Sequence, residues 1–177
     1  MIIPAGCNKR CEEFNDGFVK WLPYQVKDEI LLTDSTKIDT FFMKVTYREI
    51  THTDKIPRLA TCMCEDSYTV GLSSDTLHIS LHFAESRNFK NSMVHVNEEY
   101  FFYYEHLDSC EISGREYYNV IEYIRNQEDQ NLDPDKVFIA RSVGIIYLMI
   151  SGEIWKIVDD SKKDIDPAGI KKTIVDC

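Results

Sequence analysis

The sequence contains no hydrophobic run long enough to cross a bilayer. A membrane-spanning helix needs about 20 consecutive apolar residues, and the longest candidate, residues 143–150, is about as long as a single strand. The first residues also lack the basic and apolar segments of a complete secretory signal. With seven Gly and five Pro in 177 residues, a low-complexity or repeat design is excluded as well.

Positive charge is scarce. The chain contains 20 Lys and Arg and 30 Asp and Glu, which gives a net charge of -10. Such a field repels phosphate backbones, so we expect no nucleic-acid partner.

Catalytic and metal signatures are missing too. There is no nucleophile elbow, phosphate-binding loop or dinucleotide fingerprint, and no Cys-x-x-Cys knuckle for zinc. His78 and His82 lie on a predicted strand, where a spacing of four residues separates them by roughly 13 Å, too far for one ion. We therefore expect a protein that is not an enzyme and that has no cofactor and no metal site.

What the sequence does contain predicts a β fold. Hydrophobic residues make up 44% and aromatic residues 12% of the chain, and flat rings favour pleated surfaces. Period-two alternation or short apolar runs between turn signals predict strands. They occur at residues 29–32, 39–48, 60–72, 77–83, 92–96, 99–105, 137–148 and 153–157. We predict a mainly β fold with few or no helices, built as a curved antiparallel sheet or open half-barrel.

One domain is expected, spanning residues 15–158. Residues 1–14 are interpreted as a lipoprotein-type or flexible segment, and residues 159–177 as a charged, loose tail. Residues 15–24 are expected to form a loop or a short edge element, because Pro23 cannot donate to a ladder. The polar stretches 51–58 and 126–135 are expected to be loops.

Several local expectations follow from the alternation. Between residues 39 and 48, Phe41, Met43, Val45 and Tyr47 should share one face and Phe42, Lys44, Thr46 and Arg48 the other. Residues 116–125 fit either a helical stripe or a strand. Gly144 should take an unusual backbone angle or make a tight contact, with Trp155 buried near it.

Six cysteines, at Cys7, Cys11, Cys62, Cys64, Cys110 and Cys177, form an even set. That number is high for a reducing compartment, so disulfides are possible at Cys11, Cys62, Cys64 and Cys110. Sequence cannot choose the pairing, and free thiols or, less favoured, a metal remain alternatives for the Cys62-x-Cys64 pair. Ala5 and Gly6 before Cys7 match the small residues that precede the acylated cysteine of a lipoprotein, so Cys7 is the predicted lipidation site. A short frayed terminus is the alternative.

The C-terminal half resembles a known group of proteins. The segments SGREYYNVIEYI and KVFIARSVGIIYLMISGEIWKI resemble small uncharacterised envelope lipoproteins of the Bacteroides group, most closely over residues 113–158. The matching positions are Gly114, Tyr117, Val120, Val143, Gly144, Gly152 and Trp155. The resemblance implies a strand at residues 116–125 and a secreted protein, held at the outer membrane or in the periplasm by lipid on Cys7. It implies no biochemical role.

The aromatic run at residues 100–104 is the strongest functional hint. Consecutive rings on a strand point to both faces, so Tyr100, Phe102 and Tyr104 share one face and are a candidate ligand surface. A strand buried on both faces, an aromatic-lined cup and a protein-docking surface rimmed by acids all fit. The predicted function is a non-catalytic cell-envelope lipoprotein, a binding or structural module with a protein or small-ligand partner. The alternatives are a small acidic intracellular binder of immunity type and a β-cup carrier of an apolar or glycan ligand.

Overall fold

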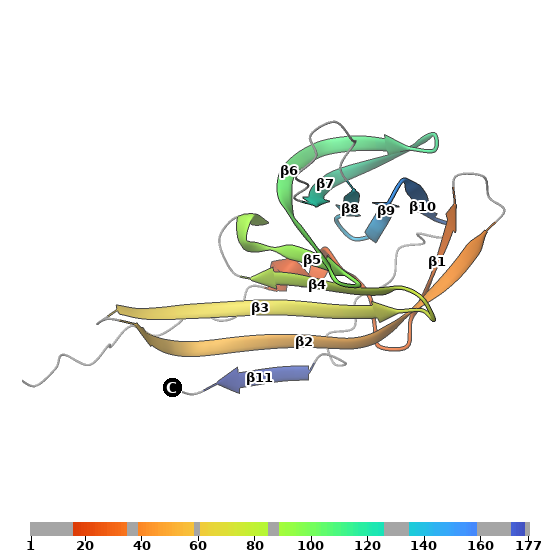
Figure 1. Cartoon of the computed structure of the whole chain (residues 1–177). Helices are drawn as coiled ribbons and strands as arrows, with labels where there is room; N and C mark the ends of the chain where they lie inside the picture. Colours follow the sequence, from red (N-terminus) through yellow and green to blue (C-terminus); the bar gives the residue numbers. More distant parts are fainter. Residues whose placement is uncertain are drawn as a thin grey trace, which may run out of the picture.

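The computed structural model describes residues 16–34, 39–58, 61–84, 89–125, 135–158 and 171–175 (Figure 1). Two short 3-10 helices and eleven strands lie in this part of the chain. The elements are η1 (Asp16–Lys20), β1 (Glu29–Asp34), β2 (Thr40–Arg58), β3 (Thr61–Ser73), β4 (His78–Ala84), η2 (Phe89–Asn91), β5 (Met93–Val96), β6 (Glu99–Ile112), β7 (Arg115–Arg125), β8 (Lys136–Ala140), β9 (Gly144–Ile150), β10 (Glu153–Ile157) and β11 (Lys171–Val175).

The strands form one sheet whose two edges meet. Strands β2 to β10 pair antiparallel in chain order, and β1 pairs antiparallel with both β10 and β2. Ten strands therefore close into a ring, and β11 adds to β2 in parallel outside it. The predicted mainly β fold and curved antiparallel sheet are confirmed. The segment from residue 159 on was expected to be loose, and its described residues, Lys171–Val175, are paired in β11.

The interior of the ring is filled by the chain itself. Inward-facing strand residues such as Leu32, Leu81 and Ile139 are buried there. Residues 15–24 were predicted to be a loop or an edge element, and the described part, residues 16–24, includes η1 and lies inside this core. Its buried side chains are Phe18, Val19, Trp21, Leu22, Pro23 and Tyr24. Burying these large apolar groups stabilises the ring, at about 1.5–3 kcal/mol for each such side chain.

A bulge in β2 corrects the predicted face assignment. The register against β3 shifts between Val45 and Tyr47, so Thr46 is an extra residue on the β2 side. Beyond it the alternation is inverted: Tyr47 is exposed and Arg48 is buried. The sequence pattern alone could not show this, because a bulge changes the pairing and not the spacing along the chain.

Strand β2 also runs further than predicted. Residues 51–58 were expected to be a loop, but they continue the strand, and Pro57 lies opposite Cys62 of β3. Pairing along the whole β2–β3 hairpin outweighs the polar composition of this stretch. Asp135, expected in a solvated loop, is 3% exposed, while residues 126–134 lie outside the described residues.

Strands β6 and β7 form a long curved hairpin that arches over β8, β9 and β10 (Figure 1). Its turn, Ser113–Gly114, has positive φ at both residues, 56° and 80°, which matches the right-handed twist of a hairpin. The strand predicted at residues 116–125 is confirmed as β7. The outer cluster packs under this hairpin; its buried members are Ile112, Tyr117, Val120, Ala140 and Ile146.

The closing hairpin β9–β10 is confirmed, with Ser151–Gly152 at its turn. The predicted run 137–148 is divided by a turn at residues 141–143. Gly144 has the expected unusual angle, φ +95°, and its tight contact is the ring of Tyr24. Trp155 packs against the core but is only half-buried, a smaller burial than predicted.

Candidate functional site

The predicted ligand surface lies on the outside of the ring. Tyr100, Phe102 and Tyr104 are 52%, 48% and 56% exposed, while Phe101 between them is fully buried. A strand buried on both faces is therefore excluded, and so is a cup lined by these three rings, since the core faces Phe101 and Tyr103.

A second bulge lies at Tyr104 and changes the direction of Glu105. The register between β6 and β7 shifts between Tyr103 and Glu105. Tyr104 is the extra residue, so Tyr104 and Glu105 are both exposed and the strand alternation restarts beyond them. Tyr104 therefore stays on the exposed side of β6 with Tyr100 and Phe102, and the bulge adds Glu105 to that side.

Neighbouring strands extend this surface. Met93 of β5 and Ile124 of β7 lie directly opposite Phe102 on its two sides, and both are half-buried. His95 stacks on Tyr100 with 4.5 Å between ring centroids. We call this surface the aromatic face; it consists of Met93, His95, Tyr100, Phe102, Tyr104 and Ile124.

Acidic groups border the aromatic face. Glu98 and Glu105 are exposed beside its rings, whereas Glu99, opposite the buried Val96, lies on the other side of β6. Arg125 bridges Glu99 and Asp135, at 3.4 Å from each carboxylate. The face is thus an apolar centre with an acidic rim, a composition typical of protein-docking surfaces.

Glu122 lies under this rim. It pairs with Lys136 at 3.6 Å and lies opposite Glu105 on β6. Burial raises the pKa of the Glu122 carboxyl above its ordinary value, Lys136 lowers it and Glu105 raises it further.

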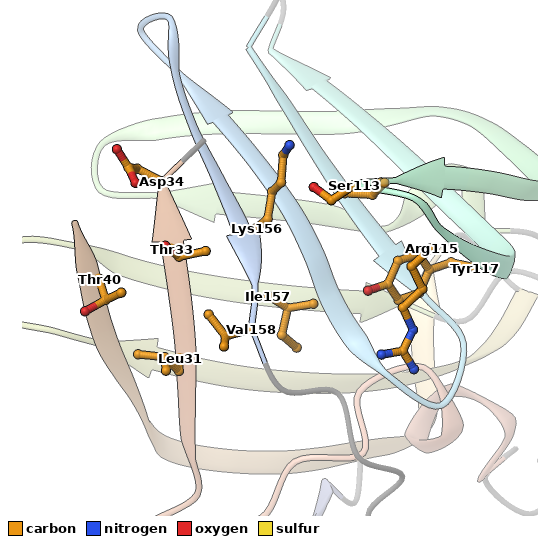
Figure 2. Close-up of a pocket in the computed structure, with 11 residues that line it drawn as sticks. Leu31, Thr33, Asp34, Thr40, Ser113, Arg115, Tyr117, Lys156, Ile157 and Val158 are labelled. Atoms are coloured by element: carbon orange, nitrogen blue, oxygen red, sulfur yellow. The ribbon is translucent and has the colours of Figure 1, made fainter. Parts of the chain in front are cut away.

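A separate cleft lies where the turn of the β6–β7 hairpin approaches β1 and β10. It has a volume of about 450 Å³. Figure 2 shows Thr33 and Asp34 on one side and Ser113, Arg115 and Tyr117 on the other, with Lys156 between them. Its lining comes from four separate segments of the chain, so no sequence pattern could have predicted it.

The ring interior holds a buried cation that sequence reasoning placed on the wrong face. Arg48 is 3% exposed, and its Nε donates to the Tyr68 hydroxyl at 3.0 Å. Tyr68 in turn donates to the carbonyl of Leu22 at 3.1 Å. Neither Nη atom of Arg48 has a hydrogen-bond partner within the described part of the chain.

Of the cysteines, only Cys110 can be described in full. It is a free, half-buried thiol, so the possible disulfide at this position is not formed in the structure. The side chain packs in the outer cluster, whose other members include no cysteine. Burial, and next the charge of Glu122, raise the pKa of the thiol, which disfavours a nucleophilic thiolate. Cys62 and Cys64 lie on β3 with only their backbone described, and Cys7, Cys11 and Cys177 lie outside the described residues.

His82 and His106 contact side chains of the fold. His82 Nδ1 lies 2.9 Å from the Thr69 hydroxyl, and burial lowers the pKa of this imidazole. His106 packs edge-on against Trp21. Among the residues that the structure describes, no three His, Cys, Asp or Glu side chains lie close enough together to hold a metal ion. In this described part of the chain, no helix is long and apolar enough to span a membrane.

Comparison with known proteins adds no family or function. No protein-family model, no curated protein and no solved structure matches this chain.

Proposed function

We propose that this protein is a non-catalytic binding module of the cell envelope, held at the membrane by lipid on Cys7, and that it docks a basic protein partner on its aromatic face. The observation that carries the docking proposal is the row of three exposed rings on β6, Tyr100, Phe102 and Tyr104. A contiguous patch of exposed large apolar side chains on a folded domain marks an interaction site, and Tyr is enriched among binding anchors.

The geometry supports a protein partner over an internal ligand. The ring interior is packed with the chain's own side chains, Trp21, Leu22 and Tyr24 among them, so an apolar molecule finds little room there. The aromatic face is also rigid, because Tyr100 is stacked on His95 and Phe102 lies between Met93 and Ile124. Rigid anchors lose little conformational entropy on binding.

Charge supports a basic partner. The net charge is -10, and Glu98 and Glu105 rim the face. Complementary charge accelerates association and rejects acidic surfaces. The Ala5-Gly6-Cys7 stretch and the resemblance to envelope lipoproteins support the compartment. An acidic intracellular binder would use the same face. The two candidates therefore differ in whether Cys7 carries a lipid.

Site-specific photo-crosslinking in the native cell tests the docking. A benzophenone amino acid at position 102 should crosslink one saturable, basic protein. The same group in place of Lys44, exposed on β2 with three strands between it and β6, should not. Equal products from both positions, or no saturable product from position 102, would overturn the proposal.

A further inference from the structure

The cleft under the β6–β7 turn is a second, independent site. Its walls are fixed: Ile112 and Tyr117 at the end of the hairpin are anchored in the outer cluster against Val120, Ala140 and Ile146. On the other side β1 and β10 are held together, and the Val158 N–H donates to the Leu31 carbonyl at 3.0 Å. A cleft of about 450 Å³ between fixed walls lies within the range of small-molecule sites.

The floor of the cleft is apolar. Leu31, Ile112, Ile157 and Val158 line it. Phe42, 60% exposed, lies directly opposite Leu31 on β2 and continues this apolar surface beyond the cleft. An elongated apolar group can therefore lie along the floor and leave the cleft beside Phe42.

The lining of the cleft carries positive charge in a protein that is strongly negative overall. Lys156 and Arg115 contribute two cations, and Asp34 one carboxylate. Figure 2 shows Asp34 and Arg115 at opposite ends, with the Lys156 side chain between Asp34 and Ser113. The Asp34 carboxylate also accepts a hydrogen bond from the Asp39 N–H at 3.3 Å. Lys156 is half-buried and has no ion-pair partner among the described residues. An anionic group next to Lys156 and the Ser113 hydroxyl would therefore be favoured.

The aromatic ring in the cleft argues against a sugar. Sugar recognition by stacking needs an open ring face. Tyr117 is 7% exposed, and the Arg115 guanidinium lies over its ring, 5.4 Å from the centroid. The cleft therefore offers charge and aliphatic surface and no stacking platform.

We propose that this cleft binds a small amphiphile with one carboxylate head, such as a medium-chain fatty acid. The carboxylate accepts hydrogen bonds from Lys156 Nζ and from the Ser113 hydroxyl. The alkyl chain lies on Leu31, Ile157 and Val158 and extends towards Phe42. This site lies at the turn of the β6–β7 hairpin and the aromatic face at its other end, so its occupancy and the docking of a protein partner can fail separately.

The test is a titration of the intact, isotopically labelled protein with decanoate below its micelle concentration, followed by NMR. Saturable shifts are expected at Leu31, Ser113 and Val158, and Lys156→Met should weaken binding at least tenfold. Lys44→Met, which removes an exposed lysine from β2 outside the cleft, is the matched control and should bind as the wild type does.

Two further ligands identify the head group and chain. Decanol should bind more weakly than decanoate and should not respond to Lys156→Met. Decyl phosphate binding as tightly as decanoate would show that any anionic head is accepted and would overturn the carboxylate assignment.

The absence of saturable shifts at the three cleft residues, or equal weakening of binding by Lys156→Met and Lys44→Met, would overturn the site. Should Lys156→Met fail to fold, Thr33→Trp, which fills the cleft from β1, is expected to abolish the same shifts.

Discussion

The phenol oxygen of Tyr24 occupies the space that a Cβ atom at residue 144 would need. The same oxygen accepts a hydrogen bond from the Ile145 N–H at 2.6 Å. Gly144 also has a φ of +95°, a conformation that side-chain-bearing residues rarely adopt. The N-terminal segment is therefore docked onto the start of β9 by a contact that only glycine permits, reinforced by the Ser142 N–H donating to the Lys20 carbonyl at 2.6 Å.

Gly144→Ala should destabilise the protein by about 3 kcal/mol, because it combines backbone strain with displacement of a buried ring. Gly152→Ala is the matched control: Gly152 has a similar φ of +82° but open space around it, so only the strain of about 1 kcal/mol remains. Tyr24→Phe should cost about 1–3 kcal/mol, since it leaves the Ile145 N–H buried without an acceptor. Urea unfolding measures all three. Equal losses for the two glycine variants would contradict this account of Tyr24.

Arg48→Met should leave stability unchanged or raise it by about 1–4 kcal/mol. A guanidinium does not deprotonate, so Arg48 is a buried charge whose two Nη groups find no partner among the described residues. Tyr68 keeps its bond to the Leu22 carbonyl in the variant. Thermal unfolding provides the measurement, with Arg48→Lys, which keeps the charge, as the comparison. A marked loss of stability in Arg48→Met would show that a counter-charge faces the guanidinium.

Glu122 should make stability depend on pH in a defined direction. Burial raises the pKa of this carboxyl in the folded state above its ordinary value of 4.5. Between 4.5 and the raised pKa the folded state binds more protons than the unfolded state, so this group's contribution to stability falls as pH rises. Glu122→Gln removes that fall. The stability of the variant relative to wild type should therefore increase with pH across this window, and chemical unfolding at several pH values would reveal a flat difference if the assignment were wrong.

Cys7→Ser should change the compartment of the protein. When the full-length precursor is made in its native cell, the wild type should label with fatty acid and fractionate with membranes, whereas the variant should be unlabelled and released. Cys110→Ser, which removes a free thiol in the outer cluster, should keep both label and membrane association. An unlabelled, soluble wild type would favour the acidic intracellular binder.

The regular strands could be predicted from the sequence because one face of each is buried. In β4, Ile79, Leu81 and Phe83 are buried and alternate with half-buried or exposed residues, which is the pattern the sequence displays. The bulges at Thr46 and Tyr104 could not be predicted, because they depend on which residue of the partner strand each residue faces. That is why Arg48 was placed on the wrong face.

The candidate sites were predictable to different extents. Tyr100, Phe102 and Tyr104 follow each other in one strand, so their common face could be predicted, while their exposure depends on which face the core occupies. The cleft brings together Asp34, Arg115 and Lys156 from strands that meet only when the ring closes and the β6–β7 hairpin bends. No local sequence pattern predicts that these three residues lie close together.

The most direct test of the docking proposal is the affinity of the purified protein for its crosslinked partner, measured at low and at high salt. Phe102→Ser should weaken binding about 30-fold, the effect of losing a central anchor worth about 2 kcal/mol. Raising the salt concentration should weaken the wild type further, because the acidic rim steers a basic partner. Tyr118→Ser, at a ring that is 61% exposed on β7 outside the aromatic face, should bind as the wild type does. An affinity unchanged by both Phe102→Ser and salt would contradict the proposed function.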